Sequence, residues 1–402
     1  MILKHIQLLF ITLILSGFAI KSGYSTPRND NNAHSTEHEI VQEEEFNAGQ
    51  MIIDHIIDSY EWHLFNWGHT HYSVYLPVII YHEGSFVTFM SSEFVDHETH
   101  QKKPVFIDAN GDVIHDIHDS HGSQATFGLA IMKDGPHKGK IAYIDAQKYI
   151  NQHNVIEDLE AGLPWDISIT KNVVALWFSI LLIILVLATV AKSYKTRKGM
   201  APKGLQSVLE PLVVFIRDDI AKSSIGEKKH AKYLPYLLTI FFFIFFNNLL
   251  GLIPILPAGA NVTGNIAITM VLAIFTFVIT TFSANKNYWV HMVNTPGVPW
   301  WLKFPIPLMP VVEIMGLFIK PFVLMVRLFA NITAGHIIVL GFMSLIFIFG
   351  GLNMYLGYGM SIVSIAFSIF LSLLEFLVAF IQAYVFTLLS ALYIGAAVEE
   401  SH

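Results

Sequence analysis

Residues 310–350 read PVVEIMGLFIKPFVLMVRLFANITAGHIIVLGFMSLIFIFG, one of two very long apolar stretches in the chain. The ionisable side chains in this stretch are Glu313, Lys320, Arg327 and His336. About 20 consecutive apolar residues are enough for a helix to cross a bilayer. The stretch therefore predicts a membrane helix so long that it must tilt strongly, bend or run partly along the membrane surface.

The whole chain has the composition of a membrane protein. Of its 402 residues, 53% are apolar and only 14% are charged, with a mean hydropathy of +0.53. A soluble domain of this length needs more charged surface. Long apolar segments cover approximately residues 173–191, 235–256, 266–285, 310–350 and 360–397. We therefore expect an all-α polytopic membrane protein with about five transmembrane helices, of which the last two are long and strongly tilted.

The first forty residues are expected to precede the folded part of the chain. Residues 1–25 have a short polar start, an apolar run of about 15 residues and small residues after it, which is typical of a signal peptide. The alternative is a first transmembrane helix, for which the run is short. The polar residues 26–40 predict a disordered leader.

Residues 41–165 are expected to form a small exported domain that is rich in histidine, because fifteen of the nineteen histidines precede residue 173. Apolar residues at helical spacing predict an amphipathic helix over 46–60. Alternating and β-branched runs predict some β structure, with strands over 72–81, 85–90 and 104–107 and a hairpin turn at Asn110 and Gly111.

The loop between the first two apolar segments indicates the orientation. Its basic residues greatly outnumber its acids, and basic loops stay on the cytoplasmic side. This predicts a bacterial inner-membrane protein whose N-terminal domain is periplasmic and whose C-terminus is cytoplasmic. Within this loop, apolar residues at helical spacing over 205–216 predict a helix lying on the membrane surface.

A few polar residues interrupt the last two apolar segments, and each of them is informative. Glu313, Lys320 and Arg327 are seven residues apart, so they share one stripe of a helix, which Asn331 continues. Glu375 and Gln382 are again seven apart in the last segment. Two long helices with polar tracks are what a proton or ion path requires.

Arg327 is the most conspicuous of these residues. A cation at the bilayer centre costs from about 3 to more than 10 kcal/mol, so it needs a partner or a wet cavity. A functional role is therefore the first hypothesis for Arg327. The alternative is a structural salt bridge with Glu313 or Glu375.

Three separated motifs resemble the a subunit of the F-type ATP synthase. They are RLFANITAGH at 327–336, IQAYVF at 381–386 and NNLLGLIP at 247–254, and they occur in the order found in that family. The resemblance covers roughly residues 170–402, expected to be the transmembrane proton-channel domain. Residues 46–64, with Asp58, Ser59, Trp62 and His63, resemble the family's leading segment more weakly.

This resemblance implies a role for each matching residue. Arg327 is expected to be the stator arginine that faces the rotor ring, with Asn331 and Gln382 lining its neighbourhood. His336 and Glu375 are expected to serve the half-channel on the exported side, and Glu313 the exit half-channel. Some bacterial members carry a carboxylate at the position of His336 and a histidine at that of Glu375.

The implied function is that of the stator subunit of the rotary ATP synthase membrane sector, without catalysis of its own. The implied partners are the c-ring rotor subunits, the peripheral-stalk b subunits, the rest of the complex and the lipid bilayer, with no nucleic acid. No cofactor or metal is expected, because the chain has no cysteine and no phosphate-binding glycine-rich loop. His336 and Glu375 favour H⁺ over Na⁺ as the transported ion.

Two other functions remain open from the residues alone. One is a stand-alone secondary ion or solute transporter, although such folds often show repeated halves, and none is visible. The other is a receptor or metal sensor that uses the exported histidines. Their spacing, at His97, His100, His115, His118 and His121, matches no defined zinc framework.

Overall fold

A computed structural model describes residues 48–67, 70–96, 102–114, 125–133, 135, 137–144, 149, 155, 157–158, 161–253, 259–293 and 308–399. The expected signal peptide at 1–25 and leader at 26–40 lie outside the described residues, as do His97, His100, His115, His118 and His121.

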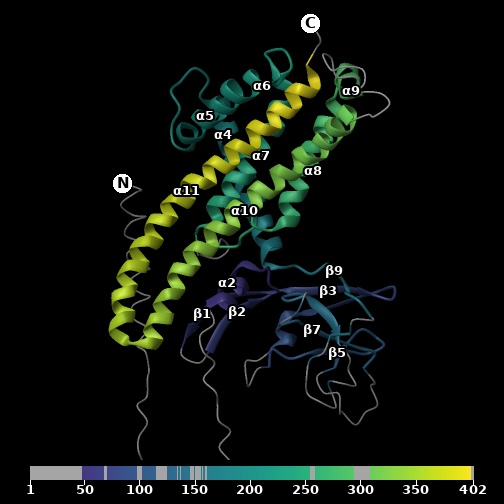
Figure 1. The fold of residues 1–402 in the computed structure, drawn as a ribbon, viewed down its shortest axis with the longest axis vertical. Coiled ribbons are helices and arrows are strands. Elements are labelled where there is room, and N and C mark those ends of the chain that lie inside the picture. Colours follow the sequence, from purple (N-terminus) through teal and green to yellow (C-terminus); the bar gives the residue numbers. More distant parts are fainter. Residues whose placement is uncertain are drawn as a thin grey trace, which may run out of the picture. The chain divides into compact units, whose positions relative to one another are not determined.

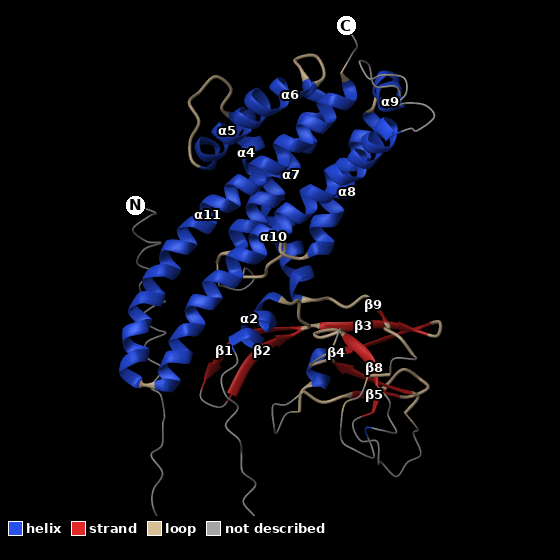
Figure 2. Cartoon of the chain, in the orientation of Figure 1, coloured by secondary structure: helices blue, strands red, loops and turns tan. Residues whose placement is uncertain are grey.

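Among the described residues, five helices are long and apolar enough to cross a membrane, which agrees with the expected number of spans. They are α4 (Lys171–Thr196), α7 (His230–Gly251), α8 (Ile266–Ser283), α10 (Leu308–Leu352) and α11 (Met354–Val398), and Figures 1 and 2 show them packed together in a bundle. A short helix, α9 (Lys286–Val293), which the sequence did not predict, follows α8.

Helices α10 and α11 form a long hairpin and lie side by side in Figure 1. Each has 45 residues, which at about 1.5 Å per residue gives about 68 Å, more than twice the ~30 Å hydrocarbon core. The turn between them is tight because Asn353 caps α11, accepting the N–H of Tyr355 at 2.9 Å. A Cβ on Gly357 would lie 2.8 Å from the Cα of Gly350, so glycine permits the close approach here.

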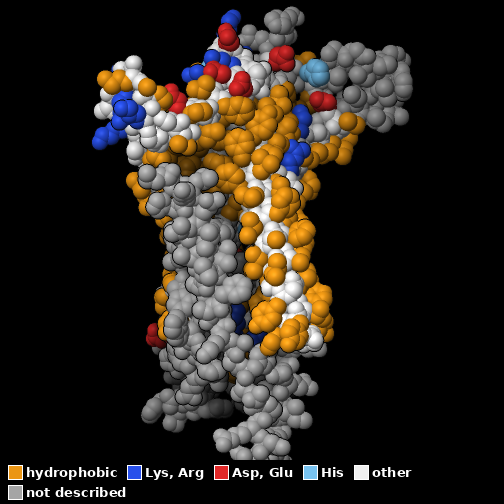
Figure 3. Space-filling view, turned by 90° about the vertical axis from the view of Figure 1, so that its left-hand side faces the viewer, with side chains coloured by type: hydrophobic (Ala, Val, Ile, Leu, Met, Phe, Trp, Pro, Cys, Tyr) orange, Lys and Arg blue, Asp and Glu red, His pale blue; other side chains and the backbone are white. Residues whose placement is uncertain are grey.

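The core of the helical part lies where α7 meets α11 and the segment before α7. Leu237, Phe241 and Ile244 of α7 are fully buried there, and Phe241 and Phe245 pack edge-on against Phe380 of α11. The outer faces of α10 and α11 remain apolar and exposed, as Figure 3 shows, while charged side chains gather toward one end of the helices. Such exposed apolar faces are expected of helices surrounded by lipid or by membrane partners.

Between α4 and α7 the chain forms α5 (Leu205–Phe215), a π-helical segment η2 (Ile216–Lys222) and the single turn α6 (Ser223–Ile225). The helix predicted over 205–216 is therefore present, and Leu209 and Ile216 on one face of this segment pack into the core. In η2, Asp218 pairs with Arg217 and Lys222, each at 2.6 Å. Arg217 first and then Lys222 hold the pKa of the Asp218 carboxyl well below its usual range.

The N-terminal part is a helix followed by three small antiparallel sheets. The helix is α2 (Ala48–Ile56), shorter than the predicted 46–60. The strands are β1 (Glu61–Trp67), β2 (Thr70–Tyr75), β3 (Pro77–His82), β4 (Ser85–Met90), β5 (Val105–Ile107), β6 (Val113–Ile114), β7 (Phe127–Ile131), β8 (Ile141–Ile144) and β9 (Trp165–Asp166). Their sheet orders are β1-β2, β4-β3-β9 and β6-β5-β7-β8.

One predicted strand proves to be two. The sequence predicts a single strand over 72–81, but the chain changes sheets at Leu76, so that β2 pairs with β1 whereas β3 pairs with β4 and β9. Leu76 is buried at the crossing, where its N–H donates to the carbonyl of Tyr60 at 3.1 Å. Pro77 opens β3 and has no N–H for a continuous ladder.

The predicted hairpin turn at Asn110 and Gly111 is confirmed. It joins β5 to β6, and Gly111 adopts φ +90°, which glycine permits without strain. The carboxylate of Asp108 accepts the N–H groups of Asn110 and Asp112, both at 2.8 Å. These backbone donors, that of Asp112 first, lower the pKa of Asp108.

Asp58 links the N-terminal part to the first span. Its carboxylate accepts the hydroxyl of Thr170 at 2.7 Å and the backbone N–H of Asn172 at 3.1 Å, so it caps the start of α4 from outside the helix. Close by, Trp62 packs against Ala175 of α4. The weakly matching motif residues Asp58 and Trp62 therefore hold the entry of the first membrane helix.

Candidate functional site

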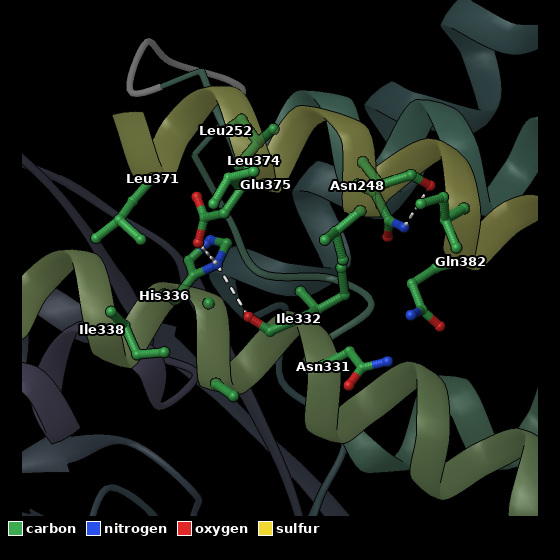
Figure 4. Close-up of a pocket in the computed structure, with 15 residues that line it drawn as sticks. Asn248, Leu252, Asn331, Ile332, His336, Ile338, Leu371, Leu374, Glu375 and Gln382 are labelled. Atoms are coloured by element: carbon green, nitrogen blue, oxygen red, sulfur yellow. Dashed lines mark hydrogen bonds and ion pairs between the residues drawn. The ribbon is translucent and has the colours of Figure 1, made fainter. Parts of the chain in front are cut away.

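The polar residues of α10 and α11 meet at a cavity of about 330 Å³. Four of the six predicted site residues line it: Asn331 and His336 from α10, and Glu375 and Gln382 from α11. Figure 4 shows His336 and Glu375 pointing toward one another across the two helices. Apolar side chains of the same helices and of α7 form most of the remaining wall, including Leu252, Ile332, Ile338, Leu371 and Leu374.

His336 and Glu375 form a close, largely buried pair. The His336 Nδ1 lies 3.8 Å from Glu375 Oε1 and 3.2 Å from the backbone carbonyl of Ile332. A carbonyl can only accept a hydrogen bond, so the contact with Ile332 requires a hydrogen on Nδ1. Glu375 Oε1 is buried and has no hydrogen-bond partner within the described residues. An acid and an imidazole thus share one cavity and can pass a proton between them.

Gly335 makes room for this pair. A Cβ at position 335 would lie 2.6 Å from Glu375 Oε1, closer than real contacts allow. The glycine next to His336 in the 327–336 motif therefore has a physical reason, because any other side chain would push the carboxylate away.

Asn248 is a site residue that the sequence did not single out. It lines the cavity from α7 and is almost fully buried. Its Oδ1 accepts the hydroxyl of Thr263 at 2.6 Å, and its Nδ2 contacts the carbonyl of Ala379 in α11 at 3.4 Å. An amide inside an apolar span was the available signal, since a buried polar group needs partners.

Arg327 does not line this cavity. It lies on α10, before Asn331 and His336 in the sequence. It is partly exposed, and within the described residues its guanidinium has no hydrogen-bond or ion-pair partner. The structural salt bridge with Glu313 or Glu375 is therefore not formed there. Tyr393 of α11 is its electrostatic neighbour, and the ring of Tyr393 also lies 5.5 Å from Lys320 Nζ.

Glu313 also lies apart from the cavity, near the start of α10. It is partly exposed and faces Tyr288 of α9, whose pKa is raised by burial and, to a smaller extent, by the charge of Glu313. The structure therefore separates the six predicted residues into a cavity group and the two charged residues Arg327 and Glu313.

A second buried polar group was also missed by the sequence interpretation. Tyr236 of α7 bonds to Thr276 of α8 at 2.7 Å, and Thr276 lies 3.3 Å from Ser390 of α11. These hydroxyls connect three spans through an otherwise apolar core. Hydroxyl residues are common in membrane helices, so their positions in the sequence gave no reason to pair them.

A family model described as "ATP synthase A chain" matches residues 173–395, which include the cavity, Arg327 and all but the first two and last three residues of the five spans. The chain belongs to the ATP synthase A chain family. The chain is similar to "ATP synthase subunit a 2" of Chlorobaculum tepidum, with 51% identity over 243 residues. It is also similar to "ATP synthase subunit a" of Chloroherpeton thalassium, with 46% identity over 252 residues. "ATP synthase subunit a" of an Anaeromyxobacter species is 41% identical over 270 residues.

These matches leave part of each A chain unaligned. They cover 59%, 61% and 64% of this chain and 65%, 71% and 61% of the respective relatives. The N-terminal part is matched separately, at residues 51–166, by a family model described as a domain of unknown function. The A-chain match therefore applies to the part with the five spans and the second match to the N-terminal part.

Proposed function

We propose that this chain is the stator subunit of the rotary ATP synthase membrane sector, where it forms two proton half-channels against the c-ring. Proton translocation through them would be coupled to ring rotation and to ATP synthesis by partner subunits. The observation that carries this proposal is the His336–Glu375 cavity between α10 and α11, with Arg327 on α10 and without an ion-pair partner within the described residues.

Arg327 suits the exchange of protons with a rotor carboxylate. Such a carboxyl must be neutral while it faces lipid, because an ion there is costly. Beside Arg327 it would ionise, since a nearby cation favours the charged form. Arginine keeps its charge in nearly all protein environments, so Arg327 also prevents a proton from passing straight between the two half-channels.

His336 and Glu375 are proposed to serve the half-channel on the exported side. The cavity gives them room for water, and Asn248, Asn331 and Gln382 supply further polar groups along its wall. A proton would pass between Glu375 and His336, whose Oε1 and Nδ1 atoms lie 3.8 Å apart, and then toward the rotor site. Glu313 is proposed to serve the exit half-channel, where α10 begins.

The orientation and partners follow from this proposal. The basic loop between α4 and α7 would be cytoplasmic, and the C-terminus with it, because Lys229 Nζ donates to the Val398 carbonyl at 2.8 Å. The exported domain would then be periplasmic in a bacterial inner membrane. The c-ring and the peripheral-stalk b subunits are the proposed neighbours, and H⁺ is the proposed ion.

An exchange of the two cavity residues tests this proposal. His336→Glu leaves two carboxyls in one cavity, and Glu375→His leaves two imidazoles, so each single variant lacks one member of the pair. The double variant restores one acid and one imidazole. We expect ATP-driven proton pumping in membrane vesicles to be several-fold faster in the double variant than in either single variant. The rates are compared at the same amount of assembled complex. A double variant that pumps no faster than the slower single variant would contradict a proton-relay role for the pair.

A further inference from the structure

The β4-β3-β9 sheet has one face in the core of the exported domain and one apolar face that is open. On the inner face, Val78, Ile80 and Val87 are buried. Residues along a strand point alternately to the two faces of a sheet. The opposite face therefore presents Tyr81, Phe86 and Trp165, which form a row across the three strands. The ring centroid of Tyr81 lies 5.1 Å from that of Phe86 and 6.4 Å from that of Trp165.

This outer face is defined here by Pro77, Ile79, Tyr81, Phe86, Met90 and Trp165. Trp165 is 75% exposed and Phe86 is 65% exposed, and Met90 and Tyr81 are exposed as well. Thr88 is the polar side chain between them, and no charged residue occupies this face within β3, β4 and the first residue of β9. A contiguous, uncharged aromatic surface of this kind marks an interaction site rather than a water-exposed face.

The chain itself holds this face close to the membrane. After β9, the N–H of Ile167 donates to the Ile79 carbonyl and that of Ile169 to the Pro77 carbonyl, at 2.9 and 3.1 Å. The span α4 begins at Lys171, whose N–H donates to the Ser59 carbonyl at 2.9 Å. Lys171 follows Trp165 by six positions, and an extended chain of that length reaches at most about 20 Å. The aromatic row is therefore tethered within that distance of the start of a membrane helix.

We propose that the outer face of the β4-β3-β9 sheet rests on the lipid bilayer, with Trp165, Tyr81 and Phe86 in the headgroup region of the leaflet from which α4 enters. Trp and Tyr prefer this region because their rings are apolar and carry a polar group at one edge. The uncharged surface fits a lipid interface better than a highly charged protein rim. The exported domain would thereby hold a fixed orientation beside the mouth of the channel. This inference requires only that α4 spans the membrane, so it can fail without the proton-channel proposal failing.

Lipid-borne and water-soluble quenchers test the contact directly. The chain has no cysteine, so Phe86→Cys provides its single thiol for a small fluorophore in the reconstituted complex. Asn110→Cys is the matched control, because Asn110 is exposed in the β5–β6 turn of the same domain. The vesicles are phosphatidylcholine with or without a spin-labelled phospholipid as the lipid-borne quencher, and iodide is the aqueous quencher.

We expect the label at position 86 to be quenched several-fold more by the spin-labelled lipid, and several-fold less by iodide, than the label at position 110. Equal iodide quenching at both positions, with no effect of the lipid quencher, would overturn the proposal. Protection of position 86 from both quenchers would also overturn it, because a protein segment would then cover this face. Trp165→Cys repeats the measurement if Phe86→Cys lowers the amount of assembled complex.

Discussion

At the scale of single residues, the cavity depends on two adjacent residues of α10 that differ in size, Gly335 and His336. His336 supplies an imidazole 3.8 Å from Glu375, and Gly335 supplies the space that the carboxylate occupies. Glu375 Oε1 has no hydrogen-bond partner within the described residues, and a Cβ at position 335 would lie 2.6 Å from it. Its position is therefore sensitive to the volume of residue 335.

We predict that Gly335→Ala slows proton pumping without preventing assembly. The added Cβ would lie 2.6 Å from the end of a flexible side chain, so Glu375 can turn away while the helices stay packed. Displacing a reacting group by about 1 Å can cost about 100-fold in rate, so a several-fold or greater loss is expected. ATP-driven pumping is measured in vesicles at matched amounts of complex. Gly341→Ala, at an open position of the same helix, is the control and should pump normally. Equal rates for the two variants would contradict the packing argument.

At the scale of elements, hydrogen bonds between distant segments hold the N-terminal part together. Tyr60, just before β1, donates its hydroxyl to Asp166 of β9 at 2.5 Å. Burial first, and the hydrogen bond to Asp166 second, raise the pKa of the Tyr60 hydroxyl above its usual value. The folded domain therefore retains this proton more strongly than the unfolded chain does.

This pKa shift predicts how the N-terminal part responds to alkaline pH. A raised pKa contributes stability that is complete below the unfolded tyrosine value of about 10 and is lost as pH rises through the higher folded value. In an ultraviolet difference titration of the wild-type chain against Tyr60→Phe, we expect no additional tyrosine to ionise near pH 10 while the domain is folded. The appearance of one more tyrosine titrating at its ordinary pKa would show that the Tyr60–Asp166 bond is absent.

Element boundaries show where the sequence pattern was sufficient and where it was not. The apolar runs predicted the spans, but α11 begins at Met354 instead of 360 because Asn353 caps it and Gly357 packs against Gly350. Helix α7 ends at Gly251, earlier than the apolar run, three residues before Pro254. In the N-terminal part, the alternation over 72–81 was real, but alternation alone does not reveal that the chain changes sheets at Leu76.

At the scale of the whole molecule, the five spans and the family were predictable because long apolar runs and three ordered motifs are strong signals. Helical spacing also placed Glu375 and Gln382 on one face of α11, and both line the cavity. The pairing of α10 with α11, and the contribution of Asn248 from α7, depend on tertiary packing that spacing along one helix does not encode. The domain boundaries at 41–165 and 170–402 and the roles of the site residues remain predictions.

The central claim concerns Arg327, and one measurement tests it most directly. ATP-driven proton pumping is compared in vesicles that contain the intact complex with wild-type chain, Arg327→Ala or Arg327→Lys. Arg327→Lys is the matched control because it keeps the charge and loses the planar guanidinium. We predict that Arg327→Ala abolishes pumping while the complex still assembles, because a rotor carboxylate then loses the cation that ionises it, and that Arg327→Lys pumps far more slowly than the wild type. Normal pumping by an assembled Arg327→Ala complex would contradict the claim.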